Sequence, residues 1–161
     1  MKKQSLFYGI IVTGLALMLL FQNWEVTKAE AWMTWPSLLI VGGAAFLAES
    51  AAGRIPLSFL PGLLMLFFGL HFHLLRILEF WPDHPGMYFL YFGLAIVLDF
   101  LQTRNSGWFT GILLLLTGAA LFYSSELRTL IGEQAAFGVE RFGPLLLLLF
   151  GLYLLFLKKN R

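Results

Sequence analysis

The chain has 161 residues, of which 59% are hydrophobic and only 12% charged, with a net charge of +2 and no cysteine. A soluble domain has roughly 45–50% apolar and about 25% charged residues, so this composition excludes a fully water-exposed surface and favours a single membrane domain. The small net charge argues against nucleic-acid binding, and the lack of cysteine excludes disulfides, thiolate catalysis and cysteine-ligated metals.

Six apolar runs, separated by segments that hold nearly all the charges, predict six short transmembrane helices. A spanning helix needs about 20 residues, so the fourth to sixth runs must extend into the interface or lie in a thinned bilayer. A re-entrant segment is the alternative for the sixth run, which is the shortest. In chain order the runs are Ser5–Phe21, Pro36–Ala52, Leu57–Leu78, Gly86–Leu101, Trp108–Tyr123 and Pro144–Leu157.

The first run also has features of a signal peptide, because Lys2 and Lys3 precede it. A pattern that resembles a cleavage site, Ala29-Glu30-Ala31, lies well beyond the run, after a Trp and two charged residues. This position is too distant for the usual cleavage geometry. We therefore expect an uncleaved first helix.

The distribution of Lys and Arg predicts the orientation of the helices. With six spans both termini lie on one side, which then holds seven of the eleven basic residues. The positive-inside rule assigns that side to the cytoplasm. The seven residues are Lys2, Lys3, Arg54, Arg104, Lys158, Lys159 and Arg161, and the other four are Lys28, Arg76, Arg128 and Arg141.

The chain also repeats itself with a period of 50 residues, which divides the membrane domain into hairpins 5–54, 55–104 and 105–161. The first helix of each hairpin carries glycines, and the second begins near a proline. Because each hairpin crosses the membrane and returns, the repeats are parallel. The pairs related by the period include Glu49 and Asp99, Arg54 and Arg104, and Gly43 and Gly93.

Glycines recur at positions that predict close contacts between helices. Small residues let helix backbones approach one another in lipid, and a separation of seven residues is close to two helical turns. We expect these glycines to pack against neighbouring helices, and a glycine-lined pore is the alternative. They are Gly43, Gly62, Gly69, Gly93, Gly111, Gly118 and Gly151.

The first hairpin resembles the LiaI/LiaF-like transmembrane region of bacterial envelope-stress proteins. The resemblance covers about residues 5–50 and consists of a glycine-bearing helix, a short polar loop and a Trp-Pro followed by an apolar run and a Gly. The segments that carry it are Gly9-Ile10-Ile11-Val12-Thr13-Gly14, Gln22-Asn23 and Trp35-Pro36-Ser37-Leu38-Leu39-Ile40-Val41-Gly42.

Two weaker copies follow, at His84-Pro85-Gly86 with Gly93 and at Gly143-Pro144 with Gly151. The chain departs from the family pattern in having three hairpins rather than two, and in lacking a counterpart of the soluble C-terminal domain of LiaF-type proteins. The resemblance implies an accessory protein of the bacterial cytoplasmic membrane. It implies no enzyme and supplies no catalytic residues.

Polar residues crowd the outer end of the third run and raise the possibility of a metal site. His71 and His73 are two residues apart, so on a regular helix they point about 200° apart and cannot bind one ion together. We therefore favour a solvated helix end over a metal or proton site. His71 is the exception, because it lies deep enough in the run to count as an intramembrane ionisable group, which is a functional candidate. The cluster comprises His71, His73, Arg76, Glu79, Asp83 and His84.

Glu49 and Asp99 occupy matching places near the inner ends of the second and fourth runs, and each is followed five residues later by an arginine, Arg54 or Arg104. This spacing is not that of a helical ion pair, so the arginine must fold back from the following turn. We expect an ion pair at the inner interface in each repeat. Proton or cation coupling through the carboxylates is the alternative.

The segment 124–142 predicts a short helix on the outer surface of the membrane. Leu127, Leu130 and Ile131 would form its apolar face. This face is a candidate surface for binding a partner, and a loop that covers the bundle is the alternative.

These patterns predict a non-enzymatic membrane scaffold or regulator that binds another membrane protein or itself, in the cell-envelope stress response. The alternative is a small ion- or proton-coupled transporter or channel that uses Glu49, Asp99 and His71. No motif for catalysis, phosphate binding or nucleic-acid recognition occurs in the sequence. We accordingly expect no cofactor and no metal.

Overall fold

The computed structural model describes residues 5–23, 33–53, 59–104, 107–124, 126, 129, 141–146, 148–149 and 151–153. These residues form helices joined by turns, and no strand occurs among them. The chain divides into two compact units, Met1–Ala119 and Ala120–Arg161.

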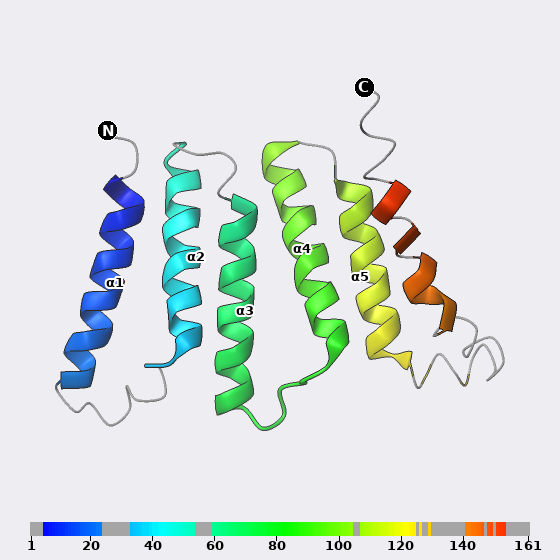
Figure 1. The fold of residues 1–161 in the computed structure, drawn as a ribbon, viewed down its shortest axis with the longest axis horizontal. Coiled ribbons are helices and arrows are strands. Elements are labelled where there is room, and N and C mark those ends of the chain that lie inside the picture. Colours follow the sequence, from blue (N-terminus) through cyan, green and yellow to red (C-terminus); the bar gives the residue numbers. More distant parts are fainter. Residues whose placement is uncertain are drawn as a thin grey trace. The chain divides into compact units, whose positions relative to one another are not determined.

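Five helices follow one another along the chain in Figure 1: α1 (Ser5–Asn23), α2 (Trp35–Ala51), α3 (Phe59–Ile77), α4 (Pro85–Thr103) and α5 (Trp108–Phe122). Helices α1, α3 and α4 are long and apolar enough to cross a membrane, whereas α2, α5 and the helical stretch Arg141–Tyr153 are apolar but shorter. The predictions of an all-helical chain and of membrane-spanning helices are thus confirmed for the described residues.

The helix ends follow from local chemistry. Pro36 and Pro85 lie in the first turns of α2 and α4, where the missing N–H of proline would have had no helical partner. His84 caps α4, because its Nδ1 accepts a hydrogen bond of 3.0 Å from the Gly86 amide. The helix ends at Arg104, which adopts the left-handed conformation with φ of 55°.

Helix α2 packs most extensively against α3, and glycines set the register of this antiparallel contact. A methyl group placed on Gly43 would lie 2.8 Å from the Gly62 carbonyl oxygen, and one on Gly69 would lie 2.9 Å from the Pro36 carbonyl oxygen. Only glycine permits backbones to approach this closely.

Helices α4 and α5 meet in the same way. A methyl group on Gly93 would lie 2.8 Å from the Gly111 carbonyl oxygen, and one on Gly118 would lie 2.9 Å from the Gly86 carbonyl oxygen. A methyl group on Gly111 would also be crowded, at 2.7 Å from the Val97 side chain. The α4–α5 contact is therefore a second copy of the α2–α3 contact, displaced by about 50 residues along the chain.

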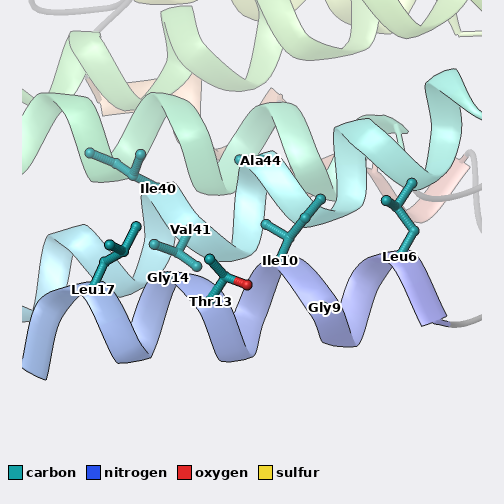
Figure 2. A pocket seen from close by; sticks show the side chains of 9 residues that line it. All are labelled: Leu6, Gly9, Ile10, Thr13, Gly14, Leu17, Ile40, Val41 and Ala44. Carbon is teal, nitrogen blue, oxygen red and sulfur yellow. The ribbon is translucent and has the colours of Figure 1, made fainter.

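Helix α1 packs against α2 less closely. Gly14 meets Val41, whereas a methyl group on Gly9 would have no atom within 4 Å. An apolar groove of about 430 Å³ lies between the two helices, and Figure 2 shows Leu6, Ile10 and other side chains that line it. In Figure 2 the Thr13 hydroxyl is the one side-chain oxygen among the lining residues.

Candidate functional site

Five polar side chains are buried among the described residues, and all of them lie on α2 or α3. Because the two helices are antiparallel, three of the five gather where α2 begins and α3 ends, and two lie at the opposite end. The first group is Ser37, His71 and His73, and the second is Glu49 and Ser50.

His71 is fully buried and connects α3 to the chain that follows it. Its Nδ1 lies 3.0 Å from the indole Nε1 of Trp81, in the turn after α3, and 3.0 Å from the hydroxyl of Tyr91 on α4. The rings of Tyr88 and Tyr91 meet the imidazole edge-on, with centroid distances of 5.5 and 5.2 Å. The histidine thus holds the α3–α4 turn and α4 against α3.

The partners of His71 define its tautomer. An indole N–H can only donate a hydrogen bond, so Nδ1 of His71 must be the acceptor and the ring proton must be on Nε2. Tyr91 then donates to the same nitrogen. The Nε2 atom is buried and has no hydrogen-bond partner among the described residues. His71 is therefore neutral, and its Nε2–H donates no hydrogen bond to a described residue. A buried polar group without a partner costs about 1–3 kcal/mol.

His73 is 1% exposed and contacts α2 rather than α4. Its Nε2 lies 2.8 Å from the hydroxyl of Ser37 on α2. The two histidines thus point to opposite sides of α3, as their separation of two residues predicts. Among the described residues no group of three His, Cys, Asp or Glu side chains could hold a metal ion.

Glu49 is 1% exposed and reaches from α2 to the first turn of α1. Its Oε1 accepts a hydrogen bond of 3.0 Å from the Phe7 amide. A carboxylate is favourable there, because the N-terminus of a helix carries partial positive charge and amides without helical partners. The other oxygen, Oε2, is buried and has no partner in the described part of the chain. Arg54, the predicted ion-pair partner, lies outside the described residues.

Asp99, the counterpart of Glu49 in the repeat, has a different environment. Its side chain is half-buried, and its backbone carbonyl accepts a hydrogen bond of 2.7 Å from the Thr103 hydroxyl. Arg104 is exposed and its amide donates to the Phe100 carbonyl as α4 ends. The predicted ion pair between Asp99 and Arg104 stays a prediction.

The remaining candidates are placed as follows. Gly43, Gly62, Gly69, Gly93, Gly111 and Gly118 lie in the helix contacts described above, whereas a methyl group on Gly151 would meet no described atom within 4 Å. The predicted partner surface, Leu127, Leu130 and Ile131, lies outside the described residues. Nearby, Glu126 and Thr129 are helical, and the Thr129 hydroxyl donates to the Glu126 carbonyl at 2.7 Å.

Sequence reasoning identified His71 and Glu49 but missed the groups that bind them. Trp81 lies in a charged segment between two apolar runs and Tyr91 lies within an apolar run, so no motif marks either of them as a partner of His71. The Phe7 amide and Ser37 carried no signal at all, because contacts between distant helices leave no trace in the spacing of a single sequence.

Comparison with known proteins agrees with the membrane assignment. Residues 6–47 match the LiaI-LiaF-like transmembrane region, a family description that covers the resemblance predicted for the first hairpin. A relative named as the uncharacterized membrane protein YsxD of Bacillus subtilis (strain 168) is 24% identical over 105 residues. This match covers 65% of the chain and 64% of the relative. No solved structure matches the chain.

Proposed function

We propose that this protein is a non-enzymatic scaffold or regulator in the cytoplasmic membrane of a bacterium, where it binds another membrane protein in the response to cell-envelope stress. It spans the membrane six times, with both termini in the cytoplasm. The match of residues 6–47 to the LiaI-LiaF-like transmembrane region supports the membrane and stress assignments. The excess of basic residues on the side of the termini supports the topology.

One observation carries the choice of a scaffold over a transporter. The buried polar groups occur at the two ends of the α2–α3 pair, and apolar, glycine-packed helix separates them. Ser37 and Glu49 are 12 residues apart on α2, which is about 18 Å at 1.5 Å per residue. No polar side chain lies between them on that helix. A transport path needs polar groups at mid-depth, which this pair does not offer.

The ion-coupled alternative rests on a separate observation. Glu49 Oε2 and His71 Nε2 are both buried and have no hydrogen-bond partner among the described residues. Buried ionisable groups with unused hydrogen-bonding capacity are typical of proton and ion pathways. This favours a small transporter or channel as the second candidate.

Reconstitution into sealed vesicles distinguishes the two functions. Vesicles with imposed proton and sodium gradients are compared with and without the protein, and with the Glu49→Gln and Asp99→Asn variants. The scaffold function predicts that all preparations hold their gradients equally. Gradient loss that requires the protein and disappears in either variant would refute the scaffold and establish the transporter.

The topology has its own test. A reporter that is active only outside the cytoplasm is fused to the C-terminus of the full chain, and a cytoplasmic reporter is fused in a parallel strain. Six spans predict activity of the cytoplasmic reporter alone. Activity of the external reporter would refute the proposed topology, because it would require either an odd number of spans or the opposite orientation.

A further inference from the structure

Phe80 has the most exposed side chain of any large hydrophobic residue in the described part of the chain, at 78%. It lies in the turn between α3 and α4, residues 78–84, and not on a helix. A single exposed apolar side chain needs no explanation by itself. The exposure of Phe80 is informative because of how the turn around it is built.

The 78–84 turn is fixed at three points. The Trp81 amide donates to the Leu78 carbonyl at 3.1 Å, which closes a tight turn with Phe80 at its tip. The indole of Trp81 is bound to the fully buried His71, and His84 at the far end caps α4. An ordered surface loses less conformational entropy when it binds, so the turn presents Phe80 in a preorganised position. His71 and Trp81 are thus positioning residues for the tip.

Three exposed charged residues lie close to this tip in the sequence. Glu79 precedes Phe80, Asp83 follows three residues later, and Arg76 lies one turn earlier at the end of α3. All three side chains are exposed, and the acids outnumber the base. Protein interfaces commonly bury aromatic side chains at their centre and keep polar and charged side chains at the solvent-accessible rim, so an exposed Phe with charged neighbours in the sequence is suited to act as such an anchor.

We propose that the 78–84 turn binds a partner protein that offers an apolar pocket for Phe80 and Lys or Arg side chains opposite Glu79 and Asp83. The proposal rests on the scaffold function and names the surface that performs it. The two acids favour a basic protein over the lipid interface, because segments that bind membrane surfaces carry Lys and Arg on their polar face. In the proposed topology the turn lies on the outer side of the membrane.

Site-specific photocrosslinking in native membranes tests this surface. A photoreactive aromatic amino acid replaces Phe80 in the full-length protein, and the same replacement at Phe109, which is 54% exposed at the start of α5, is the matched control. Mass spectrometry then identifies the crosslinked residue of each product. Position 80 is expected to react with one protein, at an apolar segment with Lys or Arg within a few residues.

Neutralising the acids tests the charge complementarity. In the Glu79→Gln and Asp83→Asn double variant we expect the yield from position 80 to fall about fivefold, because two exposed ion pairs are lost. Asp99→Asn, far along α4, should leave the yield unchanged. Equal crosslinking yields from the parent, the double variant and Asp99→Asn would refute the proposal that the partner is basic. An acidic segment at the crosslinked site would refute it as well.

The positioning residues are tested by a matched pair of variants. Tyr91→Phe keeps the phenyl ring and Trp81→Phe replaces the indole by a smaller aromatic ring, and each variant removes one hydrogen bond to Nδ1 of His71. Only Trp81 belongs to the turn, so only Trp81→Phe should lower the yield or spread the crosslinks over several partner residues. If both variants or neither behave in this way, the turn is not the element that His71 positions.

The other outcomes separate this proposal from the scaffold function. Products with lipid alone would make the turn a membrane anchor, and products with a second copy of this chain alone would make it a self-association surface, so each refutes the proposal. A protein captured from position 109 but not from 80 would refute this surface and leave the scaffold intact. The same photoreactive amino acid is also placed at two other exposed positions, Val12 and Tyr153. If none of the four positions captures a protein, both this surface and the scaffold function are refuted.

Discussion

The α2–α3 and α4–α5 contacts have the same backbone packing and different side-chain chemistry. In both, glycines bring backbone carbonyl oxygens within contact distance of the neighbouring helix. Among the described residues, only the α2–α3 pair adds buried polar side chains. In the α4–α5 pair, Met87 lies 50 residues after Ser37, and Phe122 lies 49 residues after His73. Buried polar groups are therefore not required for two helices to pair through their glycines, and they are an addition to one of the two contacts.

The largest expected effect comes from filling the glycine contacts. Gly43→Leu and Gly93→Leu should each lower the free energy of unfolding by about 3 kcal/mol, because the added side chain meets backbone rather than a movable side chain. Equilibrium unfolding in detergent measures this cost. Similar values for the two variants would support the equivalence of the contacts.

Gly9→Leu is the control for that comparison. A methyl group at Gly9 has no atom within 4 Å, so the same substitution should change the free energy of unfolding by less than about 0.5 kcal/mol. A large cost at Gly43 with none at Gly93 would mean that the α4–α5 contact is not a copy of the α2–α3 contact. Equal losses of unfolding free energy at Gly9, Gly43 and Gly93 would mean that leucine alters each helix on its own and not the contact between helices.

A smaller effect should separate the two pairs. Ser37→Ala removes the hydroxyl that meets His73 Nε2 at 2.8 Å in a buried site, which should lower the free energy of unfolding by about 1–2 kcal/mol. Thr117→Val on α5 is the matched change, because the Thr117 hydroxyl donates to the Leu113 carbonyl of its own helix. That variant should cost less than about 0.5 kcal/mol. Equal costs would show that the hydroxyl–histidine contact adds nothing to the α2–α3 pair.

The contrast also shows which parts of this protein a single sequence can predict. Apolar runs and prolines located the helices to within a few residues, because helix length and proline chemistry are local properties. The interval of seven residues placed Gly62 and Gly69 on one face, and the structure places that face on α2. Whether a given helix packs against the one before it or the one after it is not a local property, and the strongest contact joins helices that the predicted hairpins had separated.

The polar sites were predicted less well for the same reason. The period of 50 residues implied that Glu49 and Asp99 are equivalent, yet one is buried against α1 and the other is half-buried. Sequence position fixes where a carboxylate lies on its own helix. The group that it meets depends on which helix packs beside it. Glu49 meets the first turn of α1, whose backbone amides have no helical partner.

The smallest expected effect tests this difference between the carboxylates. Glu49→Gln keeps an oxygen that can accept from the Phe7 amide but removes the charge that favours the N-terminus of α1, so the free energy of unfolding should fall by about 0.3–1 kcal/mol. Asp99→Asn, which has no described contact with a helix N-terminus, should cause no measurable change. Hydrogen exchange at the Phe7 amide locates the effect, because a weaker cap should speed exchange there in Glu49→Gln and not in Asp99→Asn. If exchange at Phe7 is the same in both variants while stability falls, Glu49 acts through a group other than α1, and the cap is not what distinguishes the first carboxylate from the second.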